Sequence, residues 1–354
     1  MNPENLTMRW MRRDLHFRKP ARTSRNVLTE RPVWYLVLRE KGEETAGIGE
    51  CAPIEGLSRD PIARVASMLA EVARDLRRFV PLDDTTLAEF PAIRFALETA
   101  ILDLKHGGTR ILAPSAFTRG DATIPINGLI WMGDFDAMAH QVAQKIEEGW
   151  RCIKIKIGAL ALEKELDLLR GIRDRFPRQE LELRVDANGA FAPEQVMRVL
   201  DRLAEFDLHS IEQPIPTGRW DELGHICRRS PVPIALDEEL IPMTGLDHFR
   251  RVLDAASPQF LVLKPSFLGG VDVCAQMVSE ASSLGIACWV TSALESNIGL
   301  NAIAQWTFGQ HLPGYQGLGT GQLFTNNIPS PLQTGAGELT CRSEGLWNVS
   351  EILP

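Results

Sequence analysis

Six charged residues lie at or near the ends of short, apolar, β-branched segments, and their types suit acid–base chemistry beside a metal ion. The set comprises three lysines and three acids: Lys154, Lys156, Asp186, Glu212, Asp237 and Lys264. From Lys156 onward, successive members are roughly 25 to 30 residues apart, the length of one strand, one helix and two loops. If each segment is a strand of a closed parallel barrel, all six side chains reach the same rim.

The three acids predict a metal site. A single acid after a strand is usually a helix N-cap or a solvated turn residue, but Asp186, Glu212 and Asp237 follow three successive predicted strands. Neighbouring like charges raise one another's pKa, so all three stay ionised mainly when a cation lies between them. An all-oxygen ligand set favours Mg²⁺, for which Mn²⁺ can substitute. Water and a substrate oxygen would complete the coordination.

The lysines predict proton transfer. Lys154 and Lys156 alternate with isoleucines, so both side chains point to one face of their strand, into the barrel. A base that removes a proton from carbon needs a pKa near the working pH, which for lysine means about 7 to 8. Burial, the neighbouring ammonium of Lys154 and a dication would lower the pKa of Lys156, and the carboxylates would oppose this. Lys264 ends an apolar strand before a proline, so its buried charge requires a partner. For Lys154 and Lys156 the alternative is solvated charge on a strand edge.

The elements that would position these residues belong to an α/β fold. From residue 121 to 324, strands and helices alternate as in a TIM barrel. A helix is predicted over 136–148, and an eighth, weak strand over 315–318. The other predicted strands cover 124–131, 152–157, 183–186, 210–212, 234–237, 260–264 and 287–291.

Residues 1–120 are predicted to form an α+β capping domain. Strands over 5–17, 32–40 and 45–51 would make an antiparallel meander, followed by helices over 62–76 and 91–105. The C-terminal tail, 325–354, alternates through Leu339, Cys341 and Trp347 and is expected to return to the cap as a strand.

The ordered motifs resemble the muconate-lactonizing subgroup of the enolase superfamily. They are Lys154-Ile-Lys156, Asp186-Ala-Asn188, Glu212-Gln-Pro, Asp237-Glu and Lys264-Pro. The resemblance implies an enolase-type modified TIM barrel under an α+β cap. It also implies that Lys156 is the base, that Lys264 is a second catalytic lysine on the opposite face, and that the three acids bind Mg²⁺.

Longer segments resemble a dehydratase branch of this superfamily that acts in menaquinone biosynthesis. They are residues 184–191, 264–270, 292–299 and 317–324. The implied reaction is syn-dehydration of 2-succinyl-6-hydroxy-2,4-cyclohexadiene-1-carboxylate through a metal-stabilised enediolate. Lys156 would take the proton beside the ring carboxylate and return it to the leaving hydroxide.

A further group of residues is expected to contact or orient the substrate: Lys154, Arg184, Asn188, Ser292, Glu295 and Ser296. Each has an ordinary alternative. Arg184 is equally consistent with a surface arginine and Asn188 with a turn amide, whereas Ser and Glu after the seventh strand also cap helices. Arg22, Ser24 and Arg25 lie in a polar loop that is expected to close over the barrel mouth.

The sequence is also compatible with two other functions. An N-acylamino acid racemase or dipeptide epimerase of the same superfamily would use the two lysines in turn as acid and base. Dipeptide epimerases usually carry an Asp-x-Asp near the eighth strand for the substrate ammonium, and Gly317–Gly321 contains no carboxylate, which disfavours dipeptides. A noncatalytic barrel that only binds a metal or ligand would show no deuterium exchange at the substrate α-carbon.

Composition limits the partners. A formal net charge of −8 disfavours a nucleic-acid binder. The six cysteines lack zinc-site or paired spacing, which indicates reduced thiols and a cytoplasmic protein. No export signal or apolar segment of membrane-spanning length is visible, so no membrane association is expected. The expected partner is a small-molecule carboxylate, and the oligomeric state stays open.

Overall fold

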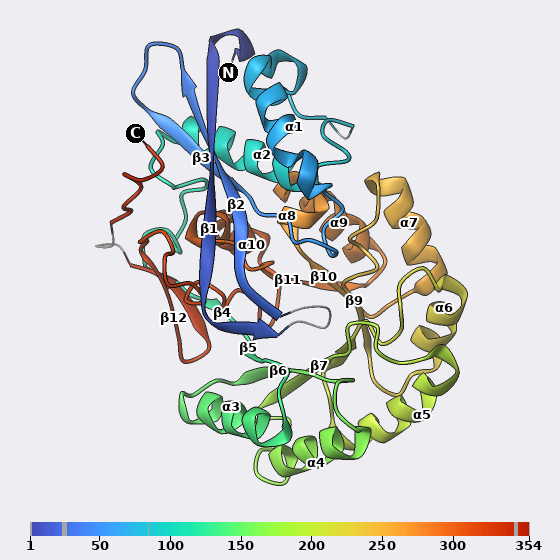
Figure 1. The fold of residues 1–354 in the computed structure, drawn as a ribbon. Coiled ribbons are helices and arrows are strands. Elements are labelled where there is room, and N and C mark those ends of the chain that lie inside the picture. The colour runs from blue at the N-terminus through green and yellow to red at the C-terminus, as the bar shows by residue number, and fades with distance from the viewer. Residues whose placement is uncertain (1, 23–26, 84, 343–345, 354) are drawn as a thin grey trace.

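The N-terminal strands form the antiparallel meander that the sequence predicts. In the computed structural model, which describes residues 2–22, 27–83, 85–342 and 346–353, β1 (Leu6–Arg22), β2 (Val27–Glu40) and β3 (Ala46–Cys51) pair in that order. Figure 1 shows these strands beside the barrel, with α1 (Ile62–Arg74) and α2 (Pro91–Lys105) packed on them. The short 3₁₀ turns Pro3–Asn5 and Leu76–Arg78 complete this part.

Both faces of this sheet are buried, which explains the continuous apolar stretch of β2. Trp34, Leu36 and Leu38 pack with the α1 and α2 side chains. The alternate residues Val33, Tyr35 and Val37 pack against C-terminal side chains such as Phe324 and Ile352. The cap sheet therefore has period-two alternation, but each face meets a different partner.

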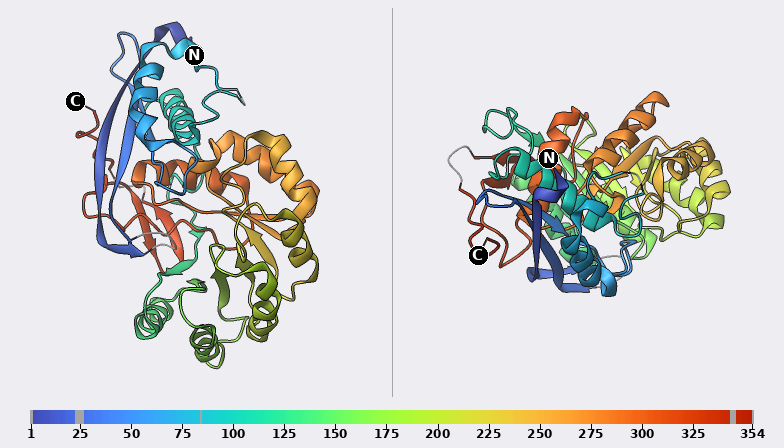
Figure 2. Two further views of the ribbon diagram at one scale, coloured as in Figure 1. Left: turned by 45° about the vertical axis from the view of Figure 1, so that its right-hand side comes forward. Right: turned by 90° about the horizontal axis from the view of Figure 1, so that it is seen from above.

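Among the described residues, the barrel sheet contains seven parallel strands, which correspond to the first seven of the eight predicted strands. Helices cover the outside of the sheet, and the views in Figures 1 and 2 show them as an arc around the strands. The strands are, in sheet order, β5 (Gly128–Ile130), β6 (Cys152–Lys156), β7 (Glu182–Asp186), β8 (Ser210–Glu212), β9 (Ile234–Leu236), β10 (Phe260–Leu263) and β11 (Ala287–Val290). The helices are α3 (Phe135–Glu147), α4 (Leu162–Arg173), α5 (Pro193–Leu203) with a 3₁₀ turn at Ala204–Phe206, α6 (Trp220–Arg229), α7 (Gly245–Ala256), α8 (Pro265–Leu268), α9 (Val271–Ser283) and α10 (Asn297–Gln310).

The weak eighth strand is reduced to two bridges, but it still connects the sheet edges. Gln316 forms a parallel bridge with Ile126, and Gly317 forms one with Thr291 after β11. The amide of Gln316 donates to Pro125 O at 2.8 Å, and the amide of Gly317 donates to Val290 O at 2.7 Å. The segment therefore joins the first and seventh strand regions and closes the ring.

The outward-facing strand residues explain why the helices pack where they do. Ile153 and Ile155 of β6, Val185 of β7 and Ile211 of β8 belong to one buried cluster with helix side chains such as Leu169 of α4. Apolar residues at alternate positions leave the intervening positions pointing into the barrel. Those inward positions carry the charged residues of the predicted site.

The tail differs from the expectation that it returns to the cap as a strand. β12 (Leu332–Gly335) pairs with β13 (Glu338–Cys341), and β13 pairs with β4 (Ile124–Pro125), which precedes the first barrel strand. The predicted strand over 124–131 is accordingly split between this small sheet and β5. The tail still reaches the cap through packing of Ile352 and an ion pair between Arg13 and Glu351.

The predicted fold class, a barrel with an α+β cap, is confirmed. The domain boundaries at residues 120 and 324 stay predictions. Among the described residues, no helix combines the length and the apolar character that crossing a membrane requires.

Candidate active site

The six charged residues meet in one cavity because the barrel strands are in register. Lys156 of β6 lies beside Asp186 of β7, and Asp186 lies beside Glu212 of β8. Asp237 and Lys264 follow β9 and β10 directly. All six line a cavity of about 830 Å³ at the carboxyl ends of the strands. Parallel strands in register thus bring residues that are far apart in the sequence to one rim.

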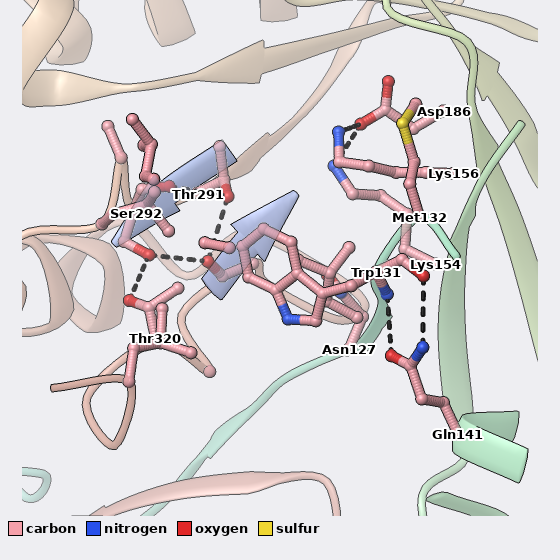
Figure 3. A pocket seen from close by; sticks show the side chains of 18 of the residues that line it. Asn127, Trp131, Met132, Gln141, Lys154, Lys156, Asp186, Thr291, Ser292 and Thr320 are labelled. Carbon is pink, nitrogen blue, oxygen red and sulfur yellow. Dashed lines mark hydrogen bonds and ion pairs between the residues drawn. The ribbon is translucent and has the colours of Figure 1, made fainter. Parts of the chain in front are cut away.

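The lysines and acids are paired across strands. Lys156 Nζ donates to Asp186 Oδ2 at 2.9 Å and to Asn188 Oδ1 at 2.7 Å. Lys154 Nζ donates to Glu212 Oε2 at 2.9 Å and lies 3.3 Å from Asp186 Oδ2. Figure 3 shows both ammonium groups directed at the Asp186 carboxylate. Lys264 pairs with Asp237 on the third acidic strand.

Burial and charge shift the pKa values of these groups in different directions. Burial raises the pKa of Asp186, but Lys156 and Lys154 lower it more strongly, so it lies well below its ordinary value. For Asp237, burial together with the neighbouring Glu238 and Glu212 outweighs Lys264, so its pKa is raised. Burial lowers the pKa of Lys264, but Asp237 and Glu238 raise it more. Burial also lowers the pKa of Lys154, and there Glu212 and Asp186 outweigh it, so the pKa of Lys154 is raised as well.

The acidic side of the cavity suits a divalent cation. Asp237 Oδ1 and Glu238 Oε2 are buried and receive no hydrogen bond from the described residues. Burial, together with the nearby carboxylates of Glu238 and Glu212, raises the pKa of Asp237, and a cation among these acids would oppose that shift. Within the described part of the chain, no three His, Cys, Asp or Glu side chains form a ready-made ligand cage, because ammonium groups lie among the carboxylates.

Three of the residues predicted to orient the substrate line the cavity. They are Lys154, Asn188 and Ser292. Asn188 accepts a hydrogen bond from Lys156 and donates one to Glu238 Oε1 at 2.8 Å, so it links the predicted base to a buried acid. Ser292 Oγ lies 2.6 Å from Thr320 Oγ1, on the side of Trp131 away from the lysines in Figure 3.

Arg184 does not line the cavity, contrary to the sequence interpretation. Its side chain runs toward the amino end of β7, where Nε donates to Glu182 Oε1 at 2.7 Å and Nη1 donates to Tyr315 O at 2.9 Å. The guanidinium carbon also lies 4.4 Å from the centre of the Trp289 ring. These contacts satisfy the arginine away from the cavity, so we no longer assign it to the substrate.

Glu295 and Ser296 also lie outside the cavity lining, and both are fully buried. Ser296 is the N-cap of α10, and its side chain accepts a hydrogen bond from the amide of Ile298 at 3.2 Å. Glu295 accepts from the amide of Ala293 at 2.7 Å and from the hydroxyl of Ser266. The capping alternative therefore describes Ser296, whereas Glu295 binds groups of the surrounding buried loops.

Several lining residues were not identified from the sequence. Glu238 lines the cavity and directly follows Asp237, a predicted metal ligand, and this adjacency could have identified it from the sequence. Asn127 lies just before β5, is 5% exposed, and its Oδ1 receives no hydrogen bond from the described residues. Trp131 and Thr320 also line the cavity, and nothing in their local sequence distinguishes them from structural residues.

The cap supplies an apolar wall to the cavity. Leu28 from β2 and Ile54 and Leu57 from the segment after β3 line it, together with Arg18 and Lys19 of β1. Of the predicted mouth loop, Ser24 and Arg25 lie outside the described residues, and so does the side chain of Arg22.

The chain is similar in sequence to known proteins with an enolase-type barrel. Residues 137–340 match a family model described as "Enolase C-terminal domain-like". An o-succinylbenzoate synthase of Desulfotalea psychrophila is 46% identical, and the match covers 94% of this chain and 98% of the relative. An N-succinylamino acid racemase of Thermus thermophilus is 29% identical over 84% of this chain and 80% of the relative.

A solved structure agrees with this comparison. The crystal structure of MenC from Desulfotalea psychrophila superimposes with a TM-score of 0.84 at 42% identity. The superposition covers 95% of this chain and 99% of that one. The likeness therefore extends over the cap as well as the barrel.

Proposed function

The chain belongs to the enolase superfamily, and we propose that it is an o-succinylbenzoate synthase. It would convert 2-succinyl-6-hydroxy-2,4-cyclohexadiene-1-carboxylate to 2-succinylbenzoate by loss of water, as a step of menaquinone biosynthesis. The near full-length similarity to the Desulfotalea psychrophila relative supports this choice within the superfamily.

The observation that carries the proposal is the placement of the two lysines. Lys156 belongs to β6 and Lys264 follows β10, four strands further round a ring that Gln316 and Gly317 complete. Strands four apart in a ring of eight positions lie on opposite walls. A substrate in the cavity would therefore have one ammonium group on each face.

In the proposed reaction, Lys156 takes the proton from the carbon that bears the ring carboxylate. The electron pair of that C–H bond forms the new ring double bond, and the C–O bond to the hydroxyl group breaks. Lys156 then returns its proton to the departing oxygen on the same face, so one water molecule leaves. Lys264 stabilises the negative charge that develops on the carboxylate, from the opposite face. Asn188 orients Lys156 through the hydrogen bond that it accepts.

Asp186, Glu212 and Asp237 would hold a divalent cation, for which their all-oxygen donor set favours Mg²⁺ over softer metals. When bound there, it supplies Lewis-acid stabilisation of charge on the substrate carboxylate. Leu28, Ile54 and Leu57 form the apolar cap wall of the cavity and would exclude water from it. Exclusion of water lowers the local dielectric constant around the ammonium groups.

A second candidate is racemization of N-succinylamino acids, which the facing lysines also favour. One lysine would remove the α-proton and the other would deliver a proton to the opposite face. A dipeptide substrate is disfavoured because Gly317, Gly319 and Thr320 line the cavity where a carboxylate for its ammonium group is expected.

Parallel assays of the purified protein with Mg²⁺ separate these functions. We expect rapid appearance of 2-succinylbenzoate absorbance from the cyclohexadiene substrate, and slower or no loss of optical rotation from N-succinylamino acids. Racemization without aromatisation would replace the proposed function with the second candidate. Absence of both reactions, with no α-deuterium exchange, would favour a noncatalytic barrel.

A further inference from the structure

Arg31 is a buried cation of the cap that the proposed chemistry does not use. It lies on β2, is 2% exposed and does not line the cavity. Its Nη1 donates to the backbone carbonyls of Ala293 and, at 2.6 Å, Leu294. Its Nη2 donates to the carbonyls of Ala52 and, at 3.3 Å, Pro53. One guanidinium therefore connects a cap segment that follows β3 with a barrel segment that follows β11.

Both connected segments are walls of the cavity. The cap segment continues into Ile54 and Leu57, and the barrel segment contributes Ser292, Ala293 and Leu294. The separation of the two walls is thus fixed at their bases by hydrogen bonds to a single planar group. Only arginine presents enough donors in a rigid fork to reach four carbonyls, and a lysine ammonium cannot reproduce that geometry.

The barrel segment needs such support because of its backbone. Leu294 has φ of 64°, in the left-handed region that residues with a Cβ rarely adopt. Such a conformation persists only where the surroundings determine it. Arg31 holds the carbonyls of Ala293 and Leu294, and Glu295 accepts from the amide of Ala293 at 2.7 Å. Leu294 lines the cavity, so this backbone sets the shape of the wall.

The charge of Arg31 is balanced within the same junction. Glu50 of β3 and Glu295 after β11 are both fully buried, and each attracts the guanidinium electrostatically. Glu50 accepts from the amides of Ser296 and Gly299 at 2.8 and 2.7 Å, at the start of α10. The junction therefore holds one cap strand, one barrel loop and one helix N-terminus together without solvent.

We propose that Arg31 is a positioning residue for substrate binding in the proposed reaction. It holds the cap wall 52–57 against the barrel wall 291–294, and this spacing orients the substrate ring between the two lysines. Because Arg31 contacts backbone rather than substrate, its loss should weaken substrate binding more than it slows proton removal. This inference rests on the proposed function for its substrate, but not for the contact itself.

The experiment compares Arg31→Met with Arg94→Met. Arg94 is a matched control because it is also buried, at 5% exposed, and also joins cap to barrel, by donating to Gly269 O outside the cavity lining. For Arg31→Met we expect KM for the cyclohexadiene substrate to rise about tenfold, with kcat within about threefold. For Arg94→Met we expect KM to stay within about twofold, whatever its effect on thermal stability.

Amide hydrogen exchange of the substrate-free protein tests the contact independently. Arg31→Met should accelerate exchange in 52–57 and 291–299, whereas Arg94→Met should accelerate it near 269–272. If Arg31→Met does not fold, Arg31→Lys serves instead, because it retains the charge but not the fork. Unchanged exchange in both wall segments would show that Arg31 does not hold the two walls together, even if the enzyme is active. Faster exchange with unchanged KM would overturn the role in substrate binding, and failure of wild-type turnover would count against the proposed function alone.

Discussion

The two ends of the barrel both carry buried charge on inward-facing strand positions, but they satisfy that charge differently. At the carboxyl end, Asp237 Oδ1 and Glu238 Oε2 lack hydrogen-bond donors among the described residues, and lysines lie between crowded acids. Toward the amino end, the guanidinium of Arg184 donates to Glu182 and Tyr315 and stacks on Trp289. One end is polar and incompletely paired, and the other is paired and closed by aromatic rings.

The difference separates chemistry from structure within one fold. Incompletely paired buried charges cost stability, so their presence at the mouth is consistent with a binding site for a divalent cation and an anionic substrate. At the amino end, Arg184, Glu182, Tyr315 and Trp289 form a paired, closed cluster, which we call the plug. Its complete pairing indicates a structural role. Substitutions at the mouth should therefore change rates, whereas substitutions at the plug should change stability.

Metal removal should have the largest effect at the mouth. We expect exhaustive chelation to abolish aromatisation, because charge on the substrate carboxylate would lose its Lewis-acid stabilisation. Added Mg²⁺ should restore the rate, which a continuous absorbance assay measures. Full activity of protein shown by elemental analysis to be metal-free would remove the three acids from the mechanism.

Replacement of Lys264 by alanine should have the next largest effect on activity. We expect about a 10²- to 10⁴-fold lower kcat, since an ammonium group opposite the base would be lost. Lys145→Ala is a suitable control, because Lys145 of α3 also lines the cavity but pairs with Glu148, the C-cap of that helix, at 3.1 Å. Equal activity of the two variants would contradict a special role for Lys264.

At the plug, Arg184→Met should lower stability without changing the kinetics. Loss of the ion pair to Glu182 and of the bond to Tyr315 O should reduce the free energy of unfolding by about 2 to 3 kcal/mol, measured by urea denaturation. KM should remain within about twofold of the wild-type value. A tenfold rise in KM would instead return Arg184 to the substrate site, as the sequence suggested.

His209 should give the plug a smaller, pH-dependent contribution. Its ring lies 4.5 Å from that of Phe260, and burial, with a further contribution from Arg184, lowers its pKa to about 4. The unfolded chain then binds more protons between pH 6.5 and 4, so this contribution to stability is complete above pH 6.5 and is lost as the pH falls toward 4. We expect wild-type protein to lose about 1 to 2 kcal/mol from this source between pH 7 and pH 5. His209→Phe should lack that loss, and identical pH profiles would contradict the shift.

The sequence predicted the barrel and the meeting of the six charged residues because both follow from repeats. Spacing of one βα unit sets the strand order, and alternation sets which face each residue occupies. Alternation does not set the direction of a long side chain along its strand. Lys154 and Arg184 are neighbours in register, yet the lysine reaches Glu212 at the mouth while the arginine reaches Glu182.

Contacts between distant segments account for the other differences. The strand Glu338–Cys341 could pair with any exposed edge, and its partner at Ile124–Pro125 lies far away in the sequence. Ser296 follows a strand as a substrate residue would, but it caps α10 and binds Glu50 of the cap. The cavity lining from Ile54 and Leu57 likewise depends on how the cap docks, which no local pattern encodes.

The most direct test of proton abstraction at the mouth is the rate of aromatisation by Lys156→Ala beside the wild-type protein, both with Mg²⁺. The variant should retain the wild-type circular dichroism spectrum, because Asn188 and Asp186 keep other partners or the cation. Its kcat should fall by about 10²- to 10⁴-fold, since the group proposed to take the proton would be lost. A folded Lys156→Ala protein with turnover near that of the wild type would contradict the assignment of the base.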